Sequence, residues 1–69
     1  MKTYKIINQT IINDQSVLTL NKKRDINEYG TSKITTNGKE YDYTITHNQY
    51  IICAKTVDDL VGKVISFVA

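Results

Sequence analysis

The chain has 69 residues, of which 41% are apolar and 23% are charged. This balance excludes a disordered chain and a membrane-spanning one, and the length allows one small domain, residues 1–69, with a modest core. Nine Lys and Arg against seven Asp and Glu give a net charge of +2, which is below the strongly basic range of a dedicated nucleic-acid domain.

A domain of this size buries only about 60% of the surface that its unfolded chain exposes, so it often needs a further source of stability. Cys53 is the single cysteine, which excludes an intrachain disulfide. A structural zinc site takes Cys or His ligands, and the chain offers only Cys53 and His47. We therefore expect no metal and no cofactor. A second subunit is the remaining common aid, and a homodimer and a monomer stay open as alternatives.

The start of the sequence contains no long apolar run, so we expect neither a signal peptide nor a membrane helix. With an unpaired cysteine, this indicates the cytoplasm. Ile, Lys, Asn and Tyr, which have AT-rich codons, supply 29 residues, whereas Gly, Ala, Arg and Pro supply 6. This bias favours an AT-rich genome, such as that of a low-GC bacterium, its phages or its mobile elements.

The first predicted element is a β-hairpin, with strands at residues 3–12 and 16–21 and a turn through Asn13, Asp14 and Gln15. Its register stays open because apolar side chains fall on both faces of the first strand. The two parities are Tyr4, Ile6 and Ile12 on one face, and Ile7 and Ile11 on the other. Such a strand is either covered on both sides or part of an interface.

After this hairpin, residues 25–30 show a capping-box spacing from Asp25 to Glu28 and a glycine, Gly30, at the point where a short helix would stop. The spacing predicts one helical turn.

Residues 33–54 predict a three-stranded antiparallel meander. Asn37-Gly38 is a strong signal for a two-residue hairpin turn, and His47-Asn48 separates two further alternating runs. Two-residue turns place Ile34 opposite Tyr41, and Tyr43 opposite Ile52. One face of the meander is then apolar: Ile34, Tyr41, Tyr43, Ile45, Tyr50, Ile52 and Ala54.

Residues 57–68 predict a C-terminal amphipathic helix, because their apolar side chains fall within one arc at 100° per residue. Thr56 would be its N-cap, and Asp58 and Asp59 would lie in its first turn. The alternative is a strand over residues 64–69, since β-branched residues form helices poorly. With the helix, the expected fold class is α+β: an antiparallel sheet of about five strands, hairpin then meander, with one helix on one face.

No residue constellation in the sequence favours catalysis. His47 would lie in a turn, roughly 20 Å from Cys53 along the following strand, so the two would not form a dyad. Asp58 and Asp59 have an ordinary place at a helix start, and Glu40 and Asp42 have predicted cross-strand partners. No phosphate loop or nucleophile elbow occurs. We therefore expect a protein that is not an enzyme.

Two surfaces are candidates for binding a partner. Lys22, Lys23 and Arg24 form the only basic cluster, which together with Tyr29 would follow a nucleic-acid backbone and stack bases. The sheet face opposite the helix would present Thr44, Ile51 and Cys53.

The leading hypothesis is a small, non-enzymatic protein-binding module, an inhibitor or regulator encoded by a phage or mobile element. It rests on the small size, the missing catalytic groups and the codon bias. The alternative is a protein that binds single-stranded nucleic acid, or follows a nucleic-acid backbone, through the basic loop. No motif of the chain resembles a known family. Small β-rich proteins that end in one helix occur among single-stranded nucleic-acid binders and phage-encoded inhibitors of host enzymes, but this is an analogy of fold alone.

Overall fold

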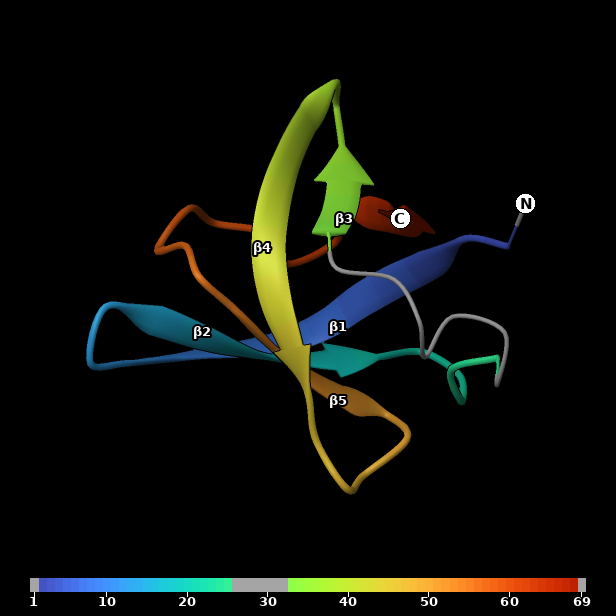
Figure 1. Cartoon of the computed structure of the whole chain (residues 1–69), viewed down its shortest axis with the longest axis horizontal. Coiled ribbons are helices and arrows are strands. Elements are labelled where there is room, and N and C mark those ends of the chain that lie inside the picture. Colours follow the sequence, from blue (N-terminus) through green and yellow to red (C-terminus); the bar gives the residue numbers. More distant parts are fainter. Residues whose placement is uncertain (1, 26–32, 69) are drawn as a thin grey trace.

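The computed structural model describes residues 2–25 and 33–68, and these residues form six antiparallel strands that close into a barrel (Figure 1). Around the barrel the strands follow the order β1-β2-β5-β4-β3-β6. Their bounds are β1 Tyr4–Ile12, β2 Gln15–Leu20, β3 Lys33–Thr36, β4 Lys39–Ile45, β5 Ile51–Ala54 and β6 Val64–Val68.

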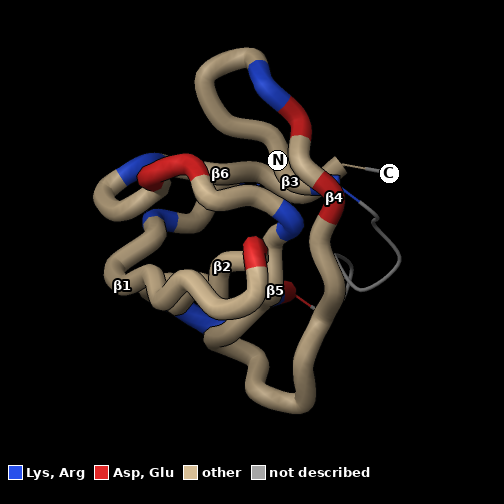
Figure 2. The backbone as a smooth tube through the Cα atoms, turned by 90° about the vertical axis from the view of Figure 1, so that its left-hand side faces the viewer, with Lys and Arg blue, Asp and Glu red and all other residues tan. Residues whose placement is uncertain are grey.

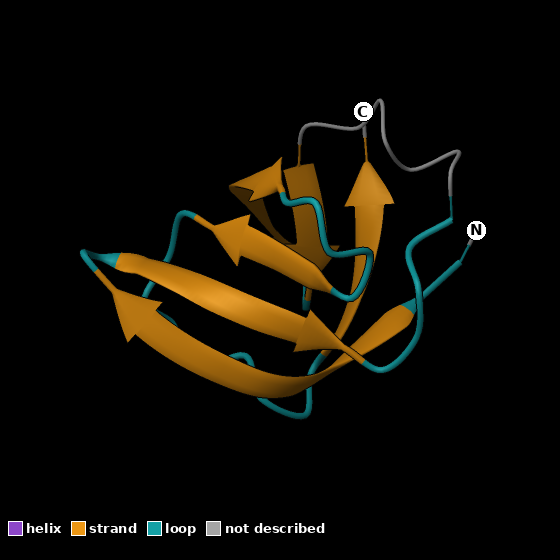
Figure 3. Cartoon of the chain, turned by 90° about the horizontal axis from the view of Figure 1, so that it is seen from below, coloured by secondary structure: helices purple, strands orange, loops and turns teal. Residues whose placement is uncertain are grey.

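The chain path contains a Greek key. Strands β3, β4 and β5 are consecutive neighbours, and the connection over residues 55–63 then returns β6 to the far side of β3. Strand β6 also pairs with β1, so it closes the barrel between the first and third strands (Figure 3).

Two hairpins end in two-residue turns with both central residues in the left-handed region. Asn13 and Asp14 have φ of 50° and 63°, and Asn37 and Gly38 have φ of 50° and 78°. Such turns match the twist of the flanking strands, and asparagine and glycine adopt them at low cost. Both predicted hairpins are therefore confirmed, the first with a turn one residue shorter than expected. The β1–β2 hairpin projects past the neighbouring strands (Figures 1 and 3).

The predicted meander is confirmed, with one change of register. Ile34 lies opposite Tyr41 as expected. Tyr43, however, lies opposite Ala54 instead of Ile52. The turn between β4 and β5 spans residues 46–50, longer than the two residues predicted. It is held by side chains: the N–H of residue 48 donates to Thr46 Oγ1 at 3.1 Å, and the N–H of residue 50 donates to the Asn48 side chain at 2.8 Å.

The core fills the interior of the barrel, where side chains from every strand meet. The predicted apolar face of the meander is largely right, but it faces the barrel interior instead of a helix. Ile45 and Tyr50 are exceptions, since both are exposed at the longer turn. The buried apolar side chains are Tyr4, Ile6, Leu18, Leu20, Ile34, Tyr43, Ile52, Ala54, Leu60, Ile65 and Phe67.

The predicted C-terminal helix is wrong, and the alternative strand is right: residues 64–68 form β6. Ile65 and Phe67 alternate into the core and pair with Tyr4 and Ile34 respectively. As a strand, the segment forms backbone hydrogen bonds with β1 on one side and with β3 on the other, so neither strand is left with an unpaired edge there. A helix cannot form these bonds. Gly62 has a φ of +82°, outside the helical region. The fold is therefore an all-β barrel and not α+β.

A β-bulge in β1 changes which parity of this strand faces inward, although Ile7, Ile11 and Ile12 all remain exposed. The register with β2 shifts between Ile6 and Asn8. Before the shift, Tyr4 and Ile6 are buried; after it, Gln9 lies opposite the buried Leu18. A bulge also bends its strand. The far half of β1 thus leaves β6 and continues as one arm of the projecting hairpin.

Beyond Asp25, the helical turn predicted over residues 25–30 lies outside the described residues. Within the described ranges, no helix is long and apolar enough to span a membrane.

Candidate functional site

The loop of residues 55–63 is fixed against the β1–β2 hairpin by one glutamine. The Gln9 amide nitrogen donates to the carbonyl of Asp58 at 2.7 Å and to Ser16 Oγ at 2.9 Å. Its amide oxygen accepts the N–H of Leu60 at 2.8 Å. Ser16 Oγ in turn donates to the carbonyl of Thr56 at 2.6 Å. With Leu60 buried beneath it, the loop is held at three of its residues.

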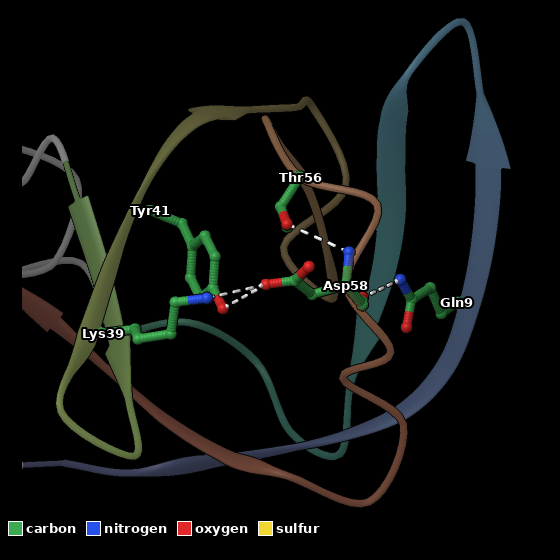
Figure 4. Close-up of polar contacts among 5 residues, drawn as sticks. All are labelled: Gln9, Lys39, Tyr41, Thr56 and Asp58. Atoms are coloured by element: carbon green, nitrogen blue, oxygen red, sulfur yellow. Dashed lines mark hydrogen bonds and ion pairs between the residues drawn. The ribbon is translucent and has the colours of Figure 1, made fainter.

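The other side of this loop is held by the β3–β4 hairpin. Figure 4 shows the Asp58 carboxylate pointing toward Tyr41 and Lys39, while the Asp58 backbone lies beside Gln9. The Tyr41 hydroxyl donates to Asp58 Oδ2 at 2.7 Å, and Lys39 Nζ lies 3.2 Å from the same oxygen. The N–H of Asp58 donates to Thr56 Oγ1 at 3.0 Å. Asp58 therefore joins two hairpins that are far apart in the sequence.

These contacts shift the pKa values of the groups that make them. The hydrogen bonds from Tyr41 and Lys39 favour the ionised carboxylate, and they lower the pKa of Asp58 below its ordinary 3.8. The same carboxylate raises the pKa of Tyr41 above its ordinary 10.0, because it accepts a hydrogen bond from the protonated phenol. It also raises the pKa of Lys39. The three groups therefore stay together, in their ordinary charge states, at neutral pH.

An apolar pocket opens between the loop and the hairpin. It has a volume of about 290 Å³. Three β-branched residues line it, and each is half exposed: Ile11 at 55%, Val57 at 51% and Val61 at 50%. Gln9 and Asp59 complete the lining. This arrangement accommodates an apolar side chain of a ligand. The Asp59 carboxylate in the lining accepts the N–H of Val61 at 3.2 Å.

The predicted basic cluster is only partly on the surface. Lys22 lies over the ring of Tyr4, with Nζ 5.2 Å from the ring centroid, and Lys23 is exposed. Arg24 is buried, and its guanidinium donates to the carbonyls of residues 46, 48 and 49 at 3.1, 3.2 and 3.4 Å. Arg24 thus holds the turn between β4 and β5. Tyr29 lies outside the described residues.

The other predicted binding residues lie on the outer face of the barrel. Thr44 is opposite Cys53, and Cys53 is also opposite Val17. Ile51 lies further along β5, opposite Thr19. The structure therefore brings Thr44 and Cys53 together, on the outside of the barrel wall and not among the residues of the pocket.

Sequence reasoning missed the pocket because it placed Val57 and Val61 on the buried face of a helix. Two signals pointed to a loop. Thr56 and Asp58 have the spacing of a turn in which a threonine oxygen accepts the N–H two residues ahead, and Gly62 interrupts the helical pattern. The role of Gln9 had no signal, since its partners are 49 and 51 residues away.

No family model, curated protein or solved structure matches the chain. Among the described residues there is no group of three His, Cys, Asp or Glu placed to hold a metal ion.

Proposed function

We propose that the chain is a non-enzymatic protein-binding module, an inhibitor or regulator of another protein, and that it binds through the pocket between the loop and the β1–β2 hairpin. One observation supports this most strongly: Ile11, Val57 and Val61 gather their exposed surfaces around one depression. Single exposed apolar side chains are common, but a contiguous group of them marks an interaction site.

The walls of the pocket are fixed before any ligand arrives. Gln9 holds the loop from the hairpin side, and Asp58 holds it from the β3–β4 side. Preorganised walls reduce the entropy that binding costs. At about 290 Å³ the pocket lies just below the range for small-molecule sites, about 300–1,000 Å³. Its size and its open, half-exposed walls suit an apolar side chain projecting from a protein surface.

The basic cluster favours a protein partner over nucleic acid. Nucleic-acid affinity depends on several cationic side chains that reach phosphates together. Here the guanidinium of Arg24 is engaged with carbonyls of a turn. Of the three residues of the cluster, this leaves the exposed Lys22 and Lys23 to reach phosphates.

The test is a pull-down with tagged protein from a lysate of a low-GC bacterium, comparing the wild type with Val57→Asp and Val61→Asp. A carboxylate in the pocket opposes burial of an apolar partner side chain. We expect both variants to lose a discrete protein that the wild type retains. The control is Ile45→Asp, which alters a similarly exposed apolar residue at the opposite end of β5 from the loop; it should retain that protein.

Each sample is tested with and without nuclease, at low and at raised salt, which gives four conditions. Salt is varied because phosphate contacts weaken steeply with salt whereas apolar contacts do not. A protein retained in all four conditions, and lost only with the pocket variants, agrees with the proposal. Retention that disappears with nuclease, or that the pocket variants leave unchanged, contradicts it.

A further inference from the structure

Among the residues that the structure describes, the far half of β1 has a strand on one side only. Between Asn8 and Ile12 it pairs with β2. Its pairing with β6 covers Tyr4 and Lys5. At Ile6 the loop takes over: the N–H of Gly62 donates to the Ile6 carbonyl at 2.8 Å, and the N–H of Ile6 donates to the Lys63 carbonyl at 3.0 Å. Past the bulge, no described strand lies along the second side of β1, which forms a margin of the sheet at the projecting hairpin (Figure 3). The barrel is therefore closed, but the hairpin that extends from it has an open edge.

The hairpin turn determines which backbone groups face this edge. Ile12 and Gln15 flank a two-residue turn, so they form a hydrogen-bonded pair, and such pairs alternate along the strands. Ile12, Thr10 and Asn8 thus direct their N–H and C=O groups to β2. Gln9 and Ile11 direct theirs away, toward the open edge.

Between Asn8 and Ile12, the open edge contains no lysine, no proline and no bulge. No charged residue lies between Lys5 and Asp14, and the segment contains no proline (Figure 2). Natural edge strands are usually blunted by lysine, proline or a bulge within the edge. Here the one bulge lies at the end of the segment, at Ile6 and Asn8, and β-branched residues follow it.

We propose that this edge pairs with the same edge of a second copy of the chain, antiparallel and around a two-fold axis at Thr10. In this register Thr10 faces Thr10 of the second copy, Gln9 faces Ile11, and Asn8 faces Ile12. The outward groups of Gln9 and Ile11 then form hydrogen-bonded pairs, as an antiparallel ladder requires. The contact is isologous, so it closes as a dimer and does not propagate.

Charge complementarity favours a second copy over an unrelated strand. The open segment is neutral, with Asp14 beyond one end and Lys5 before the other. Lys63 lies at that same basic end, because its carbonyl accepts the N–H of Ile6 at 3.0 Å. Antiparallel pairing brings the acidic turn of each copy beside the basic end of the other.

The pairing also extends the pocket surface. Gln9 and Ile11 share the face of β1 that borders the pocket. Around the axis, Ile11 of each copy comes opposite Gln9 of the other, so two pockets lie side by side. The inference goes beyond the proposed function, because dimerisation can be measured without any other partner.

The test exploits the position of Thr10 on the axis. In Thr10→Glu, two carboxylates would face each other, and in Thr10→Lys, two ammonium groups would do so. Sedimentation velocity over a dilution series should show a dimer for the wild type, monomers for each variant alone, and a restored dimer for an equal mixture of the two. Thr44→Glu and Thr44→Lys are the matched controls, since Thr44 is also an exposed strand threonine, and both should dimerise.

A disulfide provides a second readout of the register. In Cys53→Ser protein, Thr10→Cys should form a covalent dimer on mild oxidation, because facing residues of a pair that is not hydrogen-bonded have Cα atoms about 4.5 Å apart. Ile12→Cys, whose facing residue is Asn8, should cross-link far less.

A wild-type chain that stays monomeric up to about 1 mM overturns the proposal. So does a dimer that the Thr10 charges leave intact, or one that the mixture of variants fails to restore.

Discussion

A few polar side chains determine where the irregular parts of this molecule lie. Gln9 and Asp58 position the loop of residues 55–63, and Arg24 positions the turn between β4 and β5. Gln9 and Arg24 satisfy backbone groups of the loop and the turn, whereas the Asp58 carboxylate accepts hydrogen bonds from the side chains of Tyr41 and Lys39. None of these partners is near in sequence. The sequence therefore indicated the charge and turn propensity of these residues, but not that they position the loop and the turn.

Gln9→Leu should lower the free energy of unfolding by about 1–3 kcal/mol, because it leaves the N–H of Leu60 and the carbonyl of Asp58 without their hydrogen bonds. Urea unfolding of the two proteins measures the difference. The control is Gln15→Leu, which changes an exposed residue beside the turn and should shift the value by no more than about 0.5 kcal/mol. Equal losses in both variants would show that Gln9 does not hold the loop.

The contact between Tyr41 and Asp58 predicts a defined pH dependence. Because the pKa of Asp58 is lowered, its contribution to stability is present above the ordinary value of 3.8 and is lost as the pH falls through the lower value in the folded protein. Because the pKa of Tyr41 is raised, its contribution is present below 10.0 and is lost as the pH rises through the higher folded value.

Titration of tyrosinate absorbance checks this contact. In Asp58→Asn the pKa of Tyr41 should fall back toward its ordinary value, and the stability difference from the wild type should shrink at both pH extremes. Asp42→Asn is the control, because Asp42 pairs with Lys33 and not with Tyr41. A Tyr41 titration unchanged by Asp58→Asn would rule out the hydrogen bond.

At the scale of elements, the parts of the fold set by local turn residues could be predicted, and the parts set by pairing between distant segments could not. The hairpins were predictable because their turns are local, as at Asn37 and Gly38. The register from β4 to β5 was missed because Thr46 and Asn48 lengthen the turn by side-chain hydrogen bonds. The C-terminal segment has helical periodicity, yet Ile65 and Phe67 find strand partners on both sides. Tertiary pairing overrides propensity here.

The effect of Gly62→Ala on stability has opposite signs in the loop and in the helix that the sequence predicted. In a helix, Gly62→Ala would stabilise the protein by about 0.5–1 kcal/mol. In the structure Gly62 has a φ of +82° with open space around its Cα, so a Cβ meets no neighbour and only the backbone conformation opposes it. We expect Gly62→Ala to destabilise the protein by about 1–2 kcal/mol, measured by urea unfolding. Gly62→Asn should cost less, because asparagine tolerates the left-handed region. A stabilised alanine variant would contradict the loop.

At the scale of the whole molecule, closure by β6 positions the candidate site. Since β6 pairs with β1 and β3, the connection from β5 must cross between the β1–β2 and β3–β4 hairpins. This path brings Val57 and Val61 to Ile11, and none of the described strands then lies along the second side of the far half of β1. The sequence predicted the antiparallel hairpins and, for most strand residues, which side chains face the core. It did not reveal the closure, and so it did not reveal the pocket, because both depend on pairings between the two ends of the chain.

The most direct test of this account is an NMR measurement of contacts between backbone protons across β6. The account predicts cross-strand contacts from Ile65 to Tyr4 and from Phe67 to Ile34, with slow amide exchange in β6. A continuous series of helical contacts over residues 57–68, with no contact to Tyr4 or Ile34, would contradict the closed barrel and with it the pocket and the open edge.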